Sequence, residues 1–173
     1  ASSRGYYVFI GRMLQEKGVH HAISMAKKMK RKLFLFGSHD ENDPYWKKYV
    51  APHIDQKNIF YYGHVSQKKV FSILRYAEAF LFPIAWNEPF GLVMIEAMAC
   101  GVPVVGFAHG SVPEIVRDGK TGFVVKNEAE GIRALQNISA LSRSACRAWV
   151  KEKFSLTRMM DEYEKVYQKI LGL

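Results

Sequence analysis

Two glutamates, Glu88 and Glu96, flank a loop-to-helix junction at Gly91. The residues just before Gly91 include a proline and polar side chains. Residues 92–100 are helix formers and are apolar apart from Glu96. A helix that is apolar on every side is expected to be buried, and a carboxylate within it needs a partner. No charged residue stands three or four positions from Glu96, so either a distant cation pairs with it or it faces a cleft that holds a ligand.

The junction at Gly91 is itself a candidate anion site. The first N–H groups of a helix have no acceptor within the helix, and the helix dipole adds positive potential at that end. Phosphates bind readily at such a terminus. Two carboxylates and an anion site therefore lie together within residues 88–96, which form the candidate functional site.

A second stretch of interest is the loop from Gly11 to Gly18, which contains the cations Arg12 and Lys17. It has neither the G-x-G-x-x-G pattern of dinucleotide-binding loops nor the Walker A pattern. The two cations are therefore either an ordinary surface pair or, if their loop faces the helix terminus at Gly91, a pair that surrounds a diphosphate with charge. We favour phosphate binding.

Short apolar runs alternate with amphipathic segments along the chain, which predicts βαβ units and a parallel sheet with helices on both faces. The expected strands are residues 6–10, 32–36, 59–62, 79–82, 102–106 and 123–125. The expected helices are residues 19–30, 44–50, 67–77, 92–100, 113–116, 128–138, 142–151 and 156–171. The pattern indicates a Rossmann-like α/β fold with a six-stranded sheet.

Ligands of such sheets bind at the carboxyl ends of the strands, near the point where the strand order reverses. The loops after the first, third, fourth and fifth expected strands meet at this edge. They carry the candidate residues Arg12, Lys17, His64, Glu88 and His109.

The composition limits the function classes. The 173 residues, 49% of them apolar and 13% aromatic, fit one globular domain. No apolar run is long enough to cross a membrane, and no signal-peptide pattern is present. Cys100 and Cys146 have no metal-ligand spacing and fit a reducing compartment, so we expect a cytoplasmic location and no metal site. The net charge of +9 favours an anionic partner, although Lys27–Lys32 is interpreted as a solvated helix end.

The stretch from Glu88 to Val105, EPFGLVMIEAMACGVPVV, resembles the E-x7-E signature of the glycosyl transferases group 1. These are retaining nucleotide-sugar transferases of the GT-B type, family 4-like. Residues Gly11–Gly18 are similar to the phosphate-contacting Arg/Lys loop of that family, and Pro113–Val125 to its following segment. The resemblance covers nearly the whole chain but only the C-terminal half of such an enzyme.

The resemblance implies roles for the matching residues. Arg12 and Lys17 would bind the donor diphosphate and stabilise its charge as it leaves. Glu96 would accept hydrogen bonds from the ribose hydroxyls, and Glu88 would hold the sugar hydroxyls. The other implied donor-binding residues are Gly11, Gly63, His64, Val65, Ser66, Phe90, Gly91 and Leu92.

One residue departs from the family pattern. Ser111 stands where the family usually has the second of two glycines before a Pro-Glu pair, which puts the distance between that loop and the ligand in doubt. His109, two residues earlier, has no role that the sequence assigns, and an ordinary loop histidine is the simpler interpretation.

Residues 1–173 are thus expected to form the donor-binding domain of a retaining, metal-independent glycosyltransferase, with residues 156–171 as its terminal helix. Residues 1–5 are interpreted as a linker remnant, and the N-terminal acceptor domain would lie outside this chain, so the fragment alone is expected to be inactive. The donor would be a nucleoside-diphosphate sugar of the UDP or GDP type, and no cofactor is expected. A sugar or lipid-linked acceptor, and any peripheral membrane contact, would involve only the full-length protein.

Two other functions stay open at this point. A nucleotide-sugar epimerase of the same fold would consume donor without acceptor; a phosphorylase would need a pyridoxal lysine, for which there is no motif. A basic nucleic-acid-binding module needs a basic face studded with aromatic residues. The cationic cluster Lys27–Lys32 contains no aromatic residue, so no nucleic-acid partner is expected. The sequence does not determine the base, the sugar, the acceptor, the oligomeric state or a covalent role for Glu88.

Overall fold

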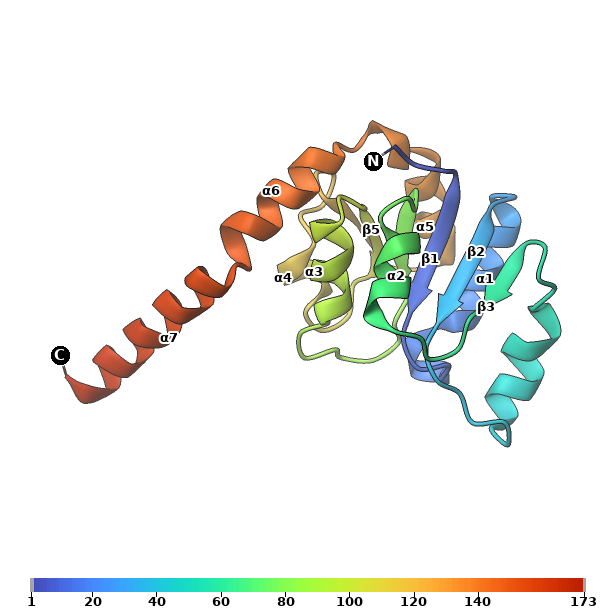
Figure 1. The fold of residues 1–173 in the computed structure, drawn as a ribbon, viewed down its shortest axis with the longest axis horizontal. Helices are drawn as coiled ribbons and strands as arrows, with labels where there is room; N and C mark the ends of the chain where they lie inside the picture. Colours follow the sequence, from blue (N-terminus) through green and yellow to red (C-terminus); the bar gives the residue numbers. More distant parts are fainter. Residues whose placement is uncertain (1, 173) are drawn as a thin grey trace.

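The computed structural model describes residues 2–172, and a six-stranded sheet in the order β3-β2-β1-β4-β5-β6 forms its centre (Figure 1). The strands are β1 (Tyr6–Ile10), β2 (Lys32–Phe36), β3 (Ile59–Tyr61), β4 (Ala79–Phe82), β5 (Val104–Phe107) and β6 (Gly122–Val125). All neighbouring strands pair in parallel. The chain moves outward from β1 to β3 and then returns to β4 on the other side of β1. The expected six-stranded Rossmann-like sheet is confirmed, and its strand order reverses between β1 and β4.

Helices cover both faces of the sheet, because successive side chains of a strand point to opposite faces. Tyr7 and Phe9 of β1 pack in one core, against α1 and α5, whereas Tyr6 and Val8 pack in the other, against α2, α3, α4 and α6. The helices are η1 (Gln15–Lys17), α1 (Val19–Lys28), η2 (Trp46–Val50), η3 (Ala51–His53), α2 (Gln67–Leu74), α3 (Leu92–Ala99), α4 (Val112–Ile115), α5 (Glu128–Gln136), η4 (Ile138–Ala140), α6 (Arg143–Lys153) and α7 (Leu156–Leu171).

Two boundaries and one helix type differ from the sequence prediction for identifiable reasons. Strand β5 begins at Val104 and not at residue 102, because Pro103 has no N–H to donate to the neighbouring strand. Helix α1 ends at Lys28 because Lys30 adopts a left-handed conformation with φ of 53°. The expected regular helix over residues 44–50 is wrong in type, since residues 46–50 form a π-helix.

Helix α3 is not buried on every side, so that expectation is wrong. Only Met94, Ala97 and Met98 are buried, whereas 65% of the Leu92 surface is exposed. Helix α3 has apolar residues on all sides. One face covers the sheet, and the opposite face lines cavities at the molecular surface. The single carboxylate of the helix, on Glu96, lies on that open side and is half-buried.

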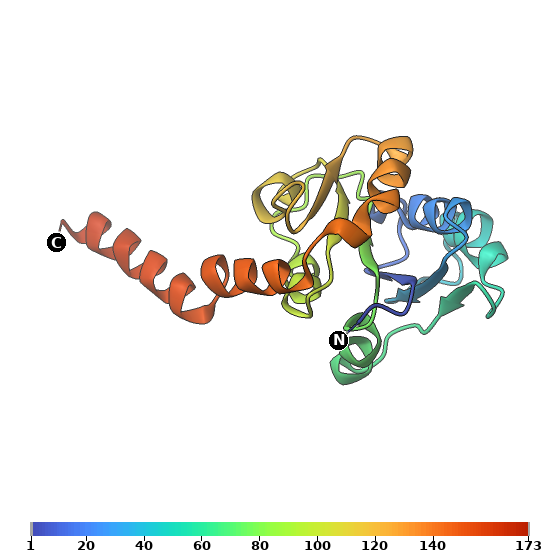
Figure 2. The same ribbon diagram turned by 90° about the horizontal axis from the view of Figure 1, so that it is seen from above.

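The C-terminal helix α7 projects away from the sheet domain as an arm (Figures 1 and 2). None of its residues is buried in this chain. Its apolar stripe is exposed throughout and comprises Leu156, Met159, Met160, Tyr163, Val166, Tyr167, Ile170 and Leu171. Across residues 2–172, every helix falls short of the length and apolarity needed to span a membrane.

Candidate functional site

The loops after β1 and β4 meet at the carboxyl edge of the sheet. The backbone N–H of Ala85 donates to the carbonyl of Glu16 at 2.8 Å, which ties the two loops together. Lys17 Nζ then lies 2.7 Å from Glu88 Oε2, and both side chains are largely buried, with 14% and 16% of their surfaces exposed. The ion pair therefore joins one residue of each predicted motif across 71 positions of sequence.

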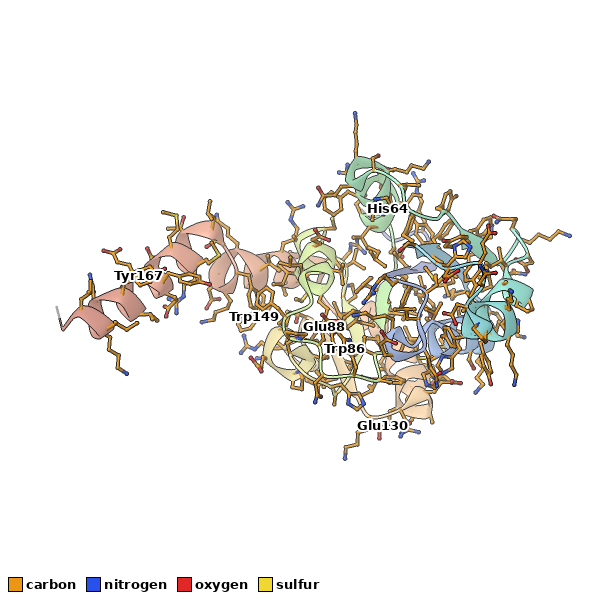
Figure 3. The ribbon with its side chains drawn as sticks, turned by 90° about the horizontal axis from the view of Figure 1, so that it is seen from below. His64, Trp86, Glu88, Glu130, Trp149 and Tyr167 are labelled. Atoms are coloured by element: carbon orange, nitrogen blue, oxygen red, sulfur yellow. The ribbon has the colours of Figure 1, made fainter. Side chains whose placement is uncertain are left out.

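Trp86 completes this contact, although sequence reasoning gave it no role. Its Nε1 donates to Glu88 Oε2 at 3.1 Å, and Lys17 Nζ lies 4.2 Å from the centre of its ring. Figure 3 shows Trp86 and Glu88 side by side on the loop between β4 and α3. The position of Trp86, two residues before Glu88, was the sequence feature that could have indicated this role. Its ring and its N–H fix the carboxylate against the cation.

Ser111 and Gly110 hold the glutamate loop from the other side. Ser111 is buried; its N–H donates to the carbonyl of Glu88 at 2.9 Å, and its hydroxyl donates to the carbonyl of Phe90 at 2.7 Å. A Cβ on Gly110 would lie 2.3 Å from the backbone N of Glu88, so only glycine fits there. The serine that departs from the family pattern thus supports the loop that carries Glu88.

A cavity of about 510 Å³, which we name the cation cavity, opens between these loops and the start of α3. Gly91, the residue before α3, has φ of 77°, and the free N–H groups of the first helical turn open at this point. The cavity thus has the positive end of a helix on one wall and two cations on the other. Its lining residues are Ile10, Gly11, Arg12, Lys17, Phe82, Glu88, Pro89, Phe90, Gly91, Leu92 and Val93.

A second cavity, of about 380 Å³, lies beside the first and is named the α2 cavity. Ile10 at the end of β1 lines both. Glu96 Oε1 accepts a hydrogen bond from Gln67 Nε2 at 3.1 Å, so an amide of α2 is the partner that the sequence could not name. The lining residues are Ile10, Phe36, Gly37, Gly63, His64, Val65, Ser66, Gln67, Val70, Phe71 and Glu96.

A tyrosine fixes the far wall of the α2 cavity. The Tyr61 hydroxyl donates to the carbonyl of Gly37 at 2.7 Å and also contacts His39 Nδ1 at 2.7 Å. Burial raises the pKa of Tyr61, so the phenol stays protonated and remains a hydrogen-bond donor at neutral pH. The loop after β2 is thereby held in place beside the loop of His64, which Figure 3 shows near α2.

The residues to which the resemblance assigns a role all line one of two adjoining cavities at one edge of the sheet. Arg12, Lys17 and Glu88 lie with the Gly91 junction in the first, and Glu96 lies with residues 63–66 in the second. His109 does not line either cavity. Within residues 2–172, no group of three or more His, Cys, Asp or Glu side chains is arranged to hold a metal ion.

The fold and the cavities together define a Rossmann-like α/β domain with two adjoining cavities where the strand order reverses, the place where ligands of such sheets bind. The sequence identifies the family within that class. The chain belongs to the glycosyl transferases group 1, whose sequence profile matches residues 2–152.

Individual relatives agree with this assignment. N-acetyl-alpha-D-glucosaminyl L-malate synthase of Bacillus anthracis is 32% identical over 127 residues, which are 69% of this chain and 32% of that protein. The crystal structure of AviGT4, a glycosyltransferase involved in avilamycin A biosynthesis, superposes with a TM-score of 0.83 at 24% identity, over 99% of this chain and 52% of AviGT4. HepE of Anabaena, solved with UDP and glucose, superposes with a TM-score of 0.79 at 20% identity, over 98% of this chain and 49% of HepE.

These matches cover only part of the relatives. The chain spans less than half the length of several curated relatives that it matches, for example 45% of a 41.2 kDa protein from the cps region of Klebsiella pneumoniae. At these low identities the solved structures establish the fold, which is shared with GT-B glycosyltransferases.

Proposed function

We propose that this chain binds the nucleoside-diphosphate sugar donor of a retaining glycosyltransferase, with no metal ion in the site. The observation that carries the proposal is the pair of adjoining cavities at the carboxyl end of β1. One has cations and a helix terminus in its walls, and the other has a carboxylate and an amide. A nucleoside diphosphate has the same two halves, an anionic diphosphate and a ribose with hydroxyl donors.

In this proposal the diphosphate occupies the cation cavity. Cleavage of the sugar–phosphate bond builds negative charge on the leaving diphosphate, and preorganised cations and N–H groups stabilise that charge. Arg12, Lys17 and the first turn of α3 supply these groups from two loops. They take the part that a divalent ion plays in other transferases, and this is why no metal is required.

Glu88 acts on the sugar side of the same cavity. Its carboxylate already accepts from Trp86 and pairs with Lys17, so its position is fixed before any donor binds. A fixed carboxylate stabilises the positive, oxocarbenium-like charge that develops on the sugar carbon. Lys17, which contacts this carboxylate, links the charge on the sugar to the charge on the diphosphate.

Glu96 holds the ribose in the α2 cavity. Of its two carboxylate oxygens, Oε1 accepts from Gln67 within residues 2–172, and the cavity wall leaves room for hydroxyl donors at the other. Residues 63–66 form the border of the base. A UDP complex of the structural neighbour HepE supports a UDP-type nucleotide, since that protein shares the fold.

The acceptor half, in this proposal, lies outside this chain, and the exposed apolar stripe of α7 packs against it. The isolated chain therefore binds donor nucleotide but transfers no sugar, because the cleft that excludes water is incomplete. Assays of donor consumption with and without acceptor test this point. Turnover of donor without acceptor by this chain would favour an epimerase.

Isothermal titration calorimetry with UDP, GDP and the matching nucleosides, in the presence of a chelator, tests the proposed function. We expect one of the diphosphates to bind in the chelator and its nucleoside to bind more weakly. Absence of binding by every nucleotide, or binding that the chelator abolishes, would contradict the proposal.

A further inference from the structure

A third cavity, of about 660 Å³, is lined by residues of α2, α3 and α6, and α6 packs against α3. We name it the basic cavity. It is distinct from the two cavities described above, although Gln67 and Phe71 line both it and the α2 cavity. Its lining residues are Gln67, Lys68, Phe71, Ser72, Arg75, Ala99, Cys100 and Arg147.

The charged residues that line the basic cavity are all cations, and the carboxylate of Glu96 lies behind the lining residue Gln67, which donates to it. Lys68 and Arg75 come from α2 and its C-cap, Arg147 comes from α6, and no acid lines the cavity. Within residues 2–172, none of these three cations lies within 4.0 Å of a carboxylate. Like charges from two helices that face one cavity repel each other, which favours occupation by an anion.

Some cations elsewhere in the chain are paired with a carboxylate. Lys28 pairs with Glu128 at 2.7 Å and Arg31 with Glu78 at 3.0 Å. Arg143, next to the basic cavity, donates to the carbonyls of Ala77 and Arg75, both at 2.7 Å. Those two bonds to neutral carbonyls leave the Arg143 charge in place, so it adds to the positive potential of the cavity.

The thiol in the basic cavity does not supply the missing negative charge. Burial raises the pKa of Cys100, in spite of the neighbouring arginines, so the thiol is neutral at physiological pH. The hydroxyl of Ser72 is neutral as well, and it donates to the carbonyl of Lys69 at 2.7 Å. Within residues 2–172, the residues that line the basic cavity therefore supply no negative charge to the three cations.

We propose that the basic cavity binds a phosphate-bearing anion, held by Arg75 and Arg147 with Lys68 at the rim. A phosphate monoester carries between one and two negative charges at neutral pH and presents oxygens to which guanidinium groups donate in pairs. Two arginines on different helices match this chemistry better than they match a neutral sugar. The phosphate comes either from a free phosphorylated molecule or from a lipid headgroup, and the site does not depend on the function proposed above.

Cys100 reports directly on occupation of this cavity. It lines the cavity and is partly exposed, whereas Cys146 is fully buried. The uncharged reagent N-ethylmaleimide therefore labels Cys100 first. Inorganic phosphate at four times its Kd leaves about one fifth of the sites open and slows labelling about fivefold. Sodium chloride of equal ionic strength controls for screening.

Matched variants locate the protection. Arg75→Gln/Arg147→Gln removes the phosphate protection, whereas Arg133→Gln/Lys151→Gln, with the same change of charge, keeps it. Arg12→Gln/Lys17→Gln also keeps it, because those residues line the cation cavity and not the basic cavity. Melting temperatures and labelling rates without phosphate verify that each variant is folded. Protection that persists in Arg75→Gln/Arg147→Gln, or is lost in Arg12→Gln/Lys17→Gln, would overturn the proposal.

Vesicles distinguish the two sources of phosphate. Protection by inorganic phosphate identifies a free phosphorylated molecule as a ligand. Protection by phosphatidic acid vesicles but not by phosphate or phosphatidylcholine vesicles identifies a lipid headgroup. Failure of both inorganic phosphate and phosphatidic acid vesicles to protect Cys100 would overturn the assignment.

Discussion

The cation cavity and the α2 cavity lie side by side at the end of β1, yet they are held together differently. The first depends on an ion pair between two loops, Lys17 to Glu88, with Trp86 against both. The second depends on a hydrogen bond between two helices, from a neutral amide to Glu96. In the proposed function, the first cavity binds the charged diphosphate and the second binds the ribose hydroxyls and the base. Substitutions in the two should affect a nucleoside diphosphate and a nucleoside differently.

The largest effect is expected from Arg12→Ala/Lys17→Ala. Each hydrogen bond to a charged group contributes about 1.5–3 kcal/mol, so loss of both should weaken a nucleoside diphosphate about 100-fold or more. The nucleoside should lose little, because it has no phosphate. Calorimetry with both ligands measures the ratio. Equal losses for the two ligands would show that the cavities are not separate in function.

A smaller effect on the same cavity is expected from Gly91→Val. Gly91 has φ of 77°, and a Cβ there would lie 2.6 Å from Met94 Cε and 3.3 Å from Glu88 Cγ. The strain of about 1–3 kcal/mol should displace the helix terminus and weaken the diphosphate about tenfold. Gly119→Val is the matched control, because Gly119 has φ of 67° and open space around it. It should lower the melting temperature but leave binding unchanged, and reduced binding in the control would contradict a local role for Gly91.

Glu96→Gln tests the α2 cavity. Loss of the charged acceptor for the ribose hydroxyls should cost about 1–3 kcal/mol, and it should weaken nucleoside and nucleoside diphosphate equally. The melting temperature should stay near that of the wild type, since Glu96 pairs only with the amide of Gln67 in residues 2–172. Glu152→Gln, on the exposed face of α6, serves as control. An unstable Glu96→Gln protein with normal affinity would point to a structural role.

The smallest effect on binding, none, is expected from Glu128→Gln, which lies outside both cavities. Burial opposes ionisation of Glu128, but hydrogen bonds from Lys28, Ser24 and His21 outweigh it and lower its pKa from 4.5 to about 2. A carboxyl group whose pKa is lower in the folded state than in the unfolded state stabilises the fold at pH values above its unfolded-state pKa. This stabilisation is lost as the pH falls towards 2. The variant should thus be less stable than the wild type at pH 7, and the difference should shrink between pH 4.5 and pH 2. A constant difference in urea unfolding would contradict this.

The sheet and most helices could be predicted from the sequence because their signals are local. Apolar runs that end at glycine mark the strands, and Ser66 caps α2 as expected, accepting from the N–H of Lys69. The gathering of Arg12, Lys17 and Glu88 at one edge also followed, since parallel strands bring their carboxyl ends together. These inferences needed only the spacing of apolar residues along the sequence and the parallel direction of the strands.

What could not be predicted depends on contacts between distant segments. Gln67 as the partner of Glu96, and Ser111 as the support of Phe90, are separated from them by 29 and 21 positions. The pairing of Lys17 with Glu88 was also missed, because each had been assigned separately to the ligand. The burial of α3 was overestimated because composition does not reveal which face a helix turns to a cavity.

The central claim is that one nucleoside diphosphate bridges the two cavities. A crystal structure of the chain with UDP, or with GDP if calorimetry selects it, tests this most directly. We expect the diphosphate to lie between Arg12, Lys17 and the N–H groups that follow Gly91, with the ribose hydroxyls on Glu96. A nucleotide bound with its phosphates away from both cations, or with its ribose outside the α2 cavity, would contradict it.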